Sequence, residues 1–303
     1  MSPDLSASVR ARLLNQAHRN SEEFERTLVR FAAERFLYRL GASRAKERCL
    51  LKGASLLAVW LPDPYRVTRD IDVLAFGAVD DAAVRDLVAE ICAVPCPEDG
   101  LEFDLHSLTL DVIRADEEYA GQRARFYALL GQARIRIQLD IGVGDAVAVE
   151  PQPVSYPTLL HTLPAPRLLG YPREQAVAEK FEAMVKLGTR NSRMKDFHDV
   201  WALSGAFAFD GVKLQRSVAA CFQRRGTPWN SEVPEVLTRA FYSDAGLQRR
   251  WSSYLAAGAV LVPPPTQFET VGARIIEFFG PVRDRLLAGA GQASTWTPGG
   301  PWG

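Results

Sequence analysis

The stretches CLLKGASLLAVW (Cys49–Trp60) and RVTRDIDVL (Arg66–Leu74) decide the fold. In an extended strand, successive side chains alternate between faces, so Asp70 and Asp72 project on one side, about 7 Å apart along the backbone. Two carboxylates side by side on one strand face repel each other, and folding alone does not require them. A hard divalent cation such as Mg²⁺ does, because it prefers oxygen ligands and is usually shared with substrate phosphates. The D-x-D strand therefore predicts a metal site.

A glycine-containing turn precedes this strand. Gly53 separates a short apolar run from a helix-like run, so the backbone N–H groups at Gly53, Ala54 and Ser55 could approach a triphosphate at a helix start. Each motif alone has an ordinary explanation, because a D-x-D strand is often a solvated face and Gly-Ala-Ser before a helix is common. Together, in this order and spacing, the two motifs favour a site for a nucleotide and a metal.

Length and composition describe an ordinary globular protein. The 303 residues suffice for one large domain or two of usual size. Lys plus Arg equal Asp plus Glu, at 36 each, so contact with nucleic acid requires a local basic surface. The four cysteines show no zinc-like spacing, and we expect reduced, mostly buried thiols. No apolar stretch reaches the length of a membrane span and no signal-peptide core is present, so we expect a cytoplasmic protein without membrane contact.

Hydrophobic periodicity predicts an α/β half followed by a helical half. In the first half we expect helices at 21–41, 55–60 and 80–92, and strands near residue 50, at the D-x-D motif, within 101–113 and at 134–141. A capping-box-like pair, Asn20 and Glu23, precedes the first of these helices. The proline-rich stretch 156–171 is the expected boundary, so the N-terminal domain is predicted to span 1–155.

The second half reads as helices throughout. We expect them at 173–188, 195–204, 211–225, 232–240, 245–257 and 268–288. The helical domain is therefore predicted to span 156–288. The remaining residues, 289–303, are rich in Gly, Pro, Ser and Thr and are expected to be disordered.

The segment RIRIQLDI (134–141) has the cleanest alternation in the chain. Its isoleucines and Leu139 line one face, and Asp140 is the single acid on the other face. If that polar face turns toward Asp70 and Asp72, a third carboxylate joins the metal site. An exposed strand face, with Asp140 paired to arginines, is an equally good interpretation of this segment alone.

A second group of charged residues opens the helical half. Lys180 lies next to a broad apolar stripe, and four basic residues follow within a short interval: Lys186, Arg190, Arg193 and Lys195. Asp196 and Asp199 lie one helical turn apart and share a face. A basic helix is usually only a solvated face. A lysine near a metal could instead neutralise triphosphate charge, and an aspartate from this helix could orient Lys180 or accept a proton.

Other catalytic constellations are missing from the sequence. There is no G-x-S-x-G elbow, no Walker-type P-loop and no G-x-G-x-x-G motif. His198 has no histidine partner at i+4, so we interpret it as a packed or solvent-facing imidazole rather than a metal ligand.

The chain resembles the AbiEii/AbiGii toxin-type nucleotidyltransferases, relatives of the minimal nucleotidyltransferases with a polymerase-beta-like fold. The matching stretches, in family order across about residues 50–203, are LKGASLLAVW, RVTRDIDVL, RIQLDIGVGD, VAEKFEAMVKLG and RMKDFHDVW. The resemblance implies an α+β fold with a mixed sheet flanked by helices, followed by a helical C-terminal domain. The family often has Gly-Gly-Thr or Gly-Ser where this chain has Gly53, Ala54 and Ser55, so Ser55 or the backbone amides must hold the phosphate.

The resemblance also implies roles for single residues. The family's metal carboxylates fall on Asp70 and Asp72, its third strand acid on Asp140, its helical lysine on Lys180, and its later acid on Asp199, with Asp196 close by. Triphosphate and RNA backbone are expected along the basic run from Lys186 and Arg190 to Lys195, and at Arg66 and Arg69.

The implied reaction is transfer of a nucleoside monophosphate from an NTP to an acceptor hydroxyl, with Mg²⁺, or Mn²⁺ in its place, as cofactor. The family's toxins belong to antitoxin-paired systems, and some modify the 3′ end of tRNA, so tRNA or another RNA and a cognate antitoxin are the expected partners. Two alternatives stay open at this point: a protein or small-molecule hydroxyl as acceptor, and a non-catalytic fold that binds a partner protein.

Overall fold

The computed structural model describes residues 3–61, 70–113, 121–229, 231–257, 262–289 and 293–303. Two compact units emerge, and each is described by itself. The sheet unit comprises Met1–Trp60, Thr68–Gly144 and Gln152–Gly170, and the helical unit comprises Leu61–Val67, Asp145–Pro151 and Tyr171–Gly303. The chain therefore passes from one unit to the other more than once.

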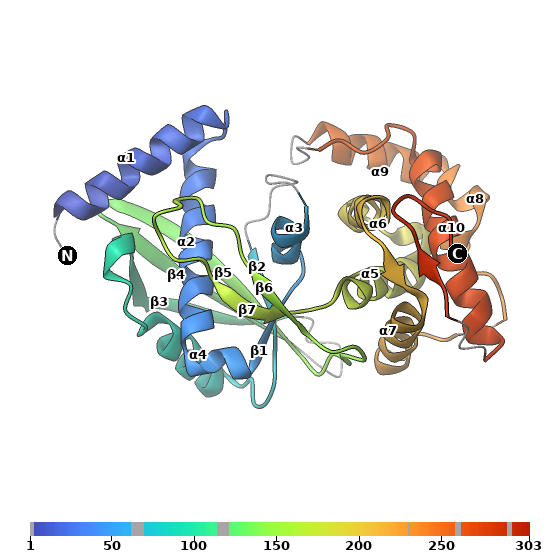
Figure 1. Ribbon diagram of the computed structural model, residues 1–303, viewed down its shortest axis with the longest axis horizontal. Helices are drawn as coiled ribbons and strands as arrows, with labels where there is room; N and C mark the ends of the chain where they lie inside the picture. Colours follow the sequence, from blue (N-terminus) through green and yellow to red (C-terminus); the bar gives the residue numbers. More distant parts are fainter. Residues whose placement is uncertain (1–2, 62–69, 114–120, 230, 258–261, 290–292) are drawn as a thin grey trace. The chain divides into compact units, whose positions relative to one another are not determined.

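Within the described ranges, the sheet unit is built on a seven-stranded mixed sheet (Figure 1). The strands follow the order β3 (Glu102–Ile113), β4 (Gly121–Leu130), β5 (Ala133–Val143), β2 (Asp70–Ala75), β1 (Cys49–Lys52), β7 (Arg167–Gly170) and β6 (Gln152–Ser155). The β2–β5 and β1–β7 pairs are parallel, and the other neighbours are antiparallel. The mixed sheet with flanking helices confirms the predicted α+β class.

One face of this sheet is apolar because alternate residues of β5 are buried isoleucines and leucine. Phe126 of β4 lies opposite Ile137 of β5 and packs on Phe36 of α2 (Phe24–Ala42), with ring centroids 5.5 Å apart. Helix α2 therefore covers the apolar face. Asp140 projects to the other face because its register differs from that of Ile137 by an odd number of residues.

The remaining helices of this unit are α1 (Pro3–Arg19), α3 (Ser55–Trp60) and α4 (Asp81–Cys92), with 3₁₀ turns at Arg44–Glu47 and Pro97–Asp99. Helix α1 and strand β4 lie outside the sequence expectation. Val9, Leu13 and Ala17 of α1 are fully buried at a spacing of four, which is a helical signal. The expected capping box does not form, because α1 runs to Arg19 and the N-cap of α2 is Glu23 without a side-chain hydrogen bond.

The helical unit contains α5 (Arg173–Leu187), α6 (Met194–Ala206), α7 (Gly211–Arg224), α8 (Arg239–Tyr242), α9 (Ala245–Ala256) and α10 (Phe268–Leu287), with 3₁₀ turns at Gly188–Arg190 and Glu235–Leu237. These bounds confirm most of the predicted helices. The helix expected at 232–240 is wrong, because Thr238 caps a separate short helix by accepting from the Phe241 N–H. Aromatic rings fill the core: Phe181 stacks on Phe279 with centroids 4.0 Å apart.

The C-terminal segment packs on this core. Strand β9 (Thr295–Trp296) pairs with β8 (Phe209–Asp210), and the Trp296 side chain is fully buried. Trp302 stacks near Phe278, with ring centroids 5.8 Å apart. Residues 293–303 therefore differ from the disordered tail that their Gly and Pro content suggested, because two tryptophans bury enough apolar surface to hold the segment.

The division between the units also differs from the one expected after residue 155. Strand β7 (Arg167–Gly170) pairs with β6 and lies parallel to β1, so residues 152–170 complete the sheet. The prolines of this stretch lie around a strand rather than along a linker. No helix in the part of the chain that the structure describes combines the length and the apolar composition that a membrane crossing requires.

Candidate functional site

Three of the predicted acids share one face of the sheet. Asp70 and Asp72 alternate with buried residues along β2, and β2 lies parallel to β5 with Asp72 opposite Asp140. Partners in register on neighbouring parallel strands project to the same face. The structure thus brings Asp70, Asp72 and Asp140 together on the face that α2 does not cover.

The surroundings of Asp72 disfavour its ionised form. Burial raises the pKa of Asp72, the charges of Asp140 and Asp70 raise it further, and Lys52 and the Ala54 N–H act in the opposite direction. Lys52 is the cross-strand partner of Asp72 on β1. The net result is a raised pKa, so the ionised carboxylate at this position is destabilised and would gain from a further positive charge.

Arg123 of β4 holds the third acid. It lies opposite Asp140 on the neighbouring strand, and its Nε and Nη2 donate to the two carboxylate oxygens at 2.7 and 2.6 Å. These hydrogen bonds raise the pKa of Arg123. Arg123 is not among the residues predicted from the sequence. The signal for it was the alternation of arginine with Ala124 and Phe126, which marks β4 as a strand with one basic face.

The turn between β1 and α3 lies directly against Asp72. Gly53 adopts a positive φ of 64°, and a Cβ at this position would overlap the Asp72 carboxylate. The Ala54 N–H donates to Asp72 Oδ2 at 3.4 Å. Ser55 is buried, and its hydroxyl donates to the Asp70 carbonyl oxygen at 3.4 Å. Glycine is required here because the backbone passes over a carboxylate.

The donor set suits a hard divalent cation in kind, since carboxylate oxygens are its preferred protein ligands. Among the described residues, however, no group of three or more His, Cys, Asp and Glu side chains is arranged to enclose a metal ion. Arg123 accounts for part of this, because it engages both Asp140 oxygens. A cation on this face would therefore rely on Asp70 and Asp72 and on oxygens from substrate or water.

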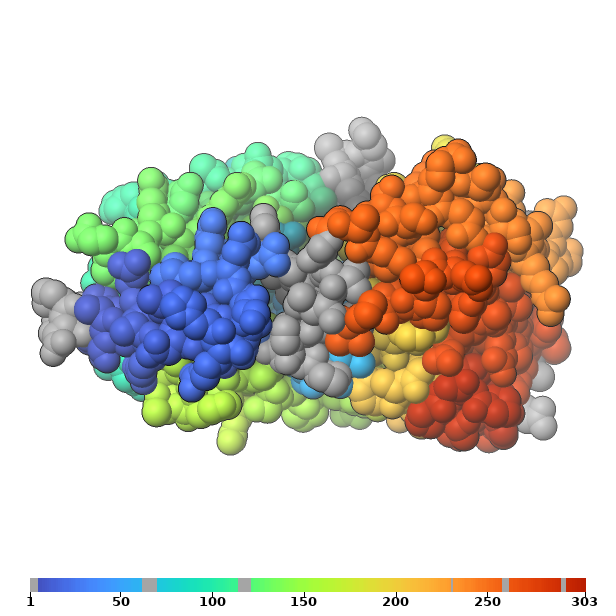
Figure 2. Space-filling model, turned by 90° about the horizontal axis from the view of Figure 1, so that it is seen from above, coloured from blue at the N-terminus to red at the C-terminus, as the bar shows by residue number. Residues whose placement is uncertain are grey.

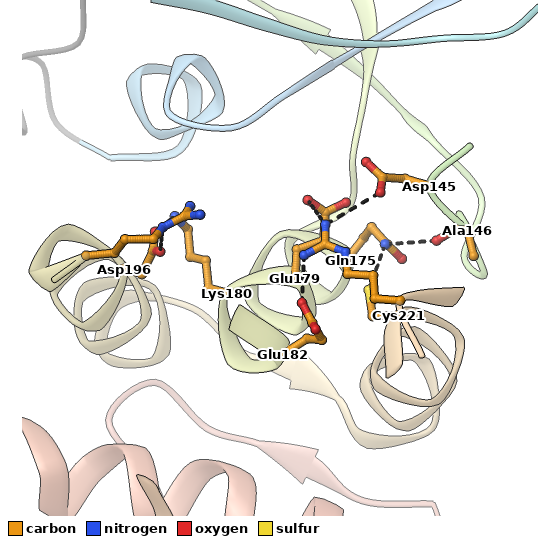
Figure 3. Close-up of polar contacts among 10 residues, drawn as sticks. Asp145, Ala146, Gln175, Glu179, Lys180, Glu182, Asp196 and Cys221 are labelled. Atoms are coloured by element: carbon orange, nitrogen blue, oxygen red, sulfur yellow. Dashed lines mark hydrogen bonds and ion pairs between the residues drawn. The ribbon is translucent and has the colours of Figure 1, made fainter. Parts of the chain in front are cut away.

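A second cluster lies in the helical unit (Figure 3). Lys180 of α5 donates to Asp196 Oδ1 at 2.9 Å and to Asp199 Oδ2 at 2.8 Å, both on α6. Arg193 approaches the other Asp196 oxygen at 2.7 Å. Burial acts to raise the pKa of Asp196, but the charges of Lys180 and Arg193 outweigh it and the pKa is lowered. The fully buried acids Asp196 and Asp199 are thus paired with cations, Lys180 with both and Arg193 with Asp196.

A third network anchors the crossing segment Asp145–Pro151 to the helices (Figure 3). Arg225 Nη1 donates to the buried Glu182 at 2.8 Å, and Nη2 lies 3.3 Å from Glu179 and 3.5 Å from Asp145. Gln175 Nε2 donates to the Ala146 carbonyl at 2.9 Å. The network therefore joins α5, the end of α7 and the crossing segment.

The other predicted residues lie elsewhere or outside the described ranges. Lys186 lies in the last turn of α5, Arg190 lies in the following 3₁₀ turn, and both residues are exposed. Arg66 and Arg69 lie outside the described residues. His198 is fully buried, and its Nδ1 lies 2.9 Å from the Tyr254 hydroxyl, so the packed interpretation of this imidazole is confirmed.

Comparison with known proteins assigns the family. A family model described as the nucleotidyl transferase AbiEii toxin of a type IV toxin–antitoxin system matches residues 35–274. The chain belongs to the AbiEii family. The match begins in α2 and ends in α10, so this AbiEii protein carries the family pattern through both units, beyond the residues that carried the sequence resemblance. No protein of curated function matches its sequence.

Two crystal structures from Helicobacter pylori are similar to this AbiEii chain at 13% sequence identity. One is JHP933, with a TM-score of 0.48, covering 84% of this chain and 90% of that one. The other is a candidate nucleotidyltransferase, with a TM-score of 0.47, covering 84% and 92%. The AbiEii assignment makes the protein a nucleotidyl transferase and a toxin component, which implies an NTP substrate and an antitoxin partner.

Proposed function

We propose that this AbiEii protein transfers a nucleoside monophosphate from an NTP to the 3′-terminal hydroxyl of a tRNA, with Mg²⁺ or Mn²⁺ as cofactor. One observation carries the proposal: Asp70, Asp72 and Asp140 share one sheet face beside a glycine turn. The raised pKa of Asp72 marks this face as one where added positive charge is favourable.

In the proposed reaction, the acceptor oxygen bonds to the α-phosphorus of the NTP. The bond from that phosphorus to the bridging oxygen breaks, pyrophosphate leaves, and the hydroxyl proton passes to water. Divalent cations, when bound, would neutralise phosphate charge and lower the pKa of the acceptor hydroxyl. Asp70 and Asp72 are the residues that would hold them.

The chain's own residues then position the reactants. Arg123 fixes the orientation of Asp140 through two hydrogen bonds, so this acid stays in place as charges arrive. Gly53 lets the backbone of the β1–α3 turn lie close to Asp72. For Lys180, Asp196 and Asp199, participation in the same reaction stays a prediction, as does triphosphate contact at Gly53, Ala54, Ser55, Arg66, Lys186 and Arg190.

The test is incorporation of label from each of the four α-labelled NTPs into total tRNA, with Mg²⁺ or Mn²⁺. We expect one or more nucleotides to label the RNA, and Asp72→Asn to reduce the rate by about a thousandfold, equivalent to about 4 kcal/mol of lost transition-state stabilisation. Asp86→Asn is the matched control, because Asp86 is exposed on α4 of the same unit.

Three results would contradict the proposal or a part of it. Undiminished transfer by Asp72→Asn would show that the chemistry lies elsewhere. Label that enters protein or a small molecule, and never RNA, would retain the enzyme class and replace the acceptor. Labelling that persists in EDTA would remove the metal from the proposal.

A further inference from the structure

A cavity of about 670 Å³ lies within the helical unit, between the start of α6 and helix α9. Its lining residues are Ser192, Arg193, Met194, Lys195, Gly246, Arg249, Arg250, Ser253 and Tyr254. Four of these are basic and none is acidic. Helix α9 lies on the outside of the unit, in orange in Figure 2.

Three of the four cations that line this cavity form no ion pair within the described residues. Among the described residues, no carboxylate forms an ion pair with Lys195, Arg249 or Arg250, although Arg193 pairs with Asp196. Arg250 is held in place by neutral acceptors, since its Nη1 donates to the carbonyl oxygens of Thr189 at 2.6 Å and Asn191 at 3.2 Å. Such a site attracts anions and retains them through several contacts.

We infer that this cavity binds the phosphodiester backbone of the acceptor RNA. Its size exceeds that of a single phosphate, and its cations come from two separate helices, as a backbone with repeated charges requires. Tyr254 adds an aromatic ring whose hydroxyl lies 2.9 Å from His198 Nδ1, so the ring is fixed. Cations combined with a fixed aromatic ring characterise grooves for single-stranded nucleic acid.

The cavity is a poorer match for an acidic partner protein. The centres of protein interfaces are depleted of charged residues such as lysine, and they are enriched in aromatic residues, methionine and arginine. Here four of the nine lining residues are Arg or Lys, and Met194 is buried rather than presented at the surface. The inference rests on the proposed function only for the identity of the RNA as the acceptor.

The test measures binding without catalysis. A fluorescein-labelled single-stranded RNA of about 12 nucleotides is titrated in EDTA, without NTP, from about 50 to 200 mM KCl. We expect the double variant Lys195→Gln, Arg249→Gln to bind about tenfold more weakly, and the slope of log affinity against log salt to fall by about 1.4, which is about 0.7 for each lost contact.

The matched control is Lys213→Gln, Arg216→Gln, which removes the same charge from exposed positions on α7 of the same unit. It should bind RNA within twofold of the wild type. Thermal melts must show that both double variants are folded.

Two outcomes would overturn the inference: unchanged RNA affinity in the cavity variant, or an equal loss of affinity in the control. Failure of the proposed function gives a different result, because the wild type would then bind RNA through this cavity and transfer no nucleotide to it.

Discussion

The sheet and the helical unit each hold a cluster of aspartates, and the two clusters are tuned in opposite directions. On the sheet, burial and the neighbouring acids raise the pKa of Asp72. Between the helices, Lys180 and Arg193 overcome burial and lower the pKa of Asp196. An ionised aspartate is therefore destabilised on the sheet, at Asp72, and stabilised between the helices, at Asp196.

The difference lies in where the compensating charge comes from. Asp196 and Asp199 are fully buried and have Lys180 within hydrogen-bonding distance of both. On the sheet, Arg123 is committed to Asp140, while burial and the charges of Asp140 and Asp70 raise the pKa of Asp72 in spite of Lys52. The two acids of the helical cluster share a lysine that hydrogen-bonds to both, whereas the surroundings of Asp72 disfavour its ionised form.

Removing Lys180 should have the largest effect on stability. Lys180→Met would leave Asp196 and Asp199 buried side by side, so we expect a loss of about 3 to 5 kcal/mol in the free energy of unfolding. Urea unfolding measures this loss. Lys213→Met, at an exposed position of α7 in the same unit, should change it little. A similar small effect of both variants would show that the helical cluster is not an ionic unit.

Asp196→Asn should destabilise the protein by about 2 kcal/mol, because Lys180 keeps Asp199 but the charge-assisted contacts to Asp196 are weakened. The measurement is again urea unfolding at neutral pH. A gain in stability would contradict the lowered pKa of Asp196.

Asp72→Asn should have the opposite sign. A raised pKa means that the ionised side chain opposes folding at neutral pH, so its replacement by a neutral amide should stabilise the protein by about 1 kcal/mol in EDTA. Mg²⁺ should reduce this gain by stabilising the wild type. If Asp72→Asn and Asp196→Asn lose stability equally, the contrast between the clusters fails.

Acid should remove the advantage of the Asp196 carboxylate. Its folded pKa lies below the ordinary 3.8, so its contribution is complete above that value and is lost as pH falls through the folded pKa. Urea unfolding from pH 6 down toward about pH 3 should show the difference between wild type and Asp196→Asn shrinking by about 1 kcal/mol. A constant difference across this range would assign the effect to packing rather than charge.

Much of the sheet cluster could be anticipated from sequence because strand alternation has a fixed period. In the D-x-D strand and in the RIRIQLDI strand, every second residue lies on the same face, so the face that carries the acids follows from residue spacing alone. Their register across the sheet, with Asp72 opposite Asp140, could not be derived from either segment, since it depends on non-local pairing. Arg123, which holds Asp140, was missed because β4 was not predicted as a strand, although its local alternation of partly exposed and buried residues was present in the sequence.

The helical unit was predictable in its elements and less so in its contacts. The spacing of one helical turn predicted that Asp196 and Asp199 share a face. Their hydrogen bonds to Lys180 could not be predicted, because they depend on how α5 packs on α6. Arg249 and Arg250 gave no local signal beyond two adjacent arginines, and only the approach of α9 to the start of α6 makes them part of a cavity. The prediction of a disordered tail rested on Gly and Pro content. Composition does not show that Trp296 is buried in the core or that Trp302 stacks near Phe278.

The parallel pairing of β1 with β7 has a consequence during synthesis. Strand β1 comprises residues 49–52, yet its second neighbour is residues 167–170, reached only after the crossing segment 145–151 has been made. A nascent chain on the ribosome therefore cannot complete its sheet until residue 170 has left the exit tunnel. Until then β1 is an edge strand whose second side is unpaired. Translation of the first half of this toxin is therefore not sufficient to complete its sheet.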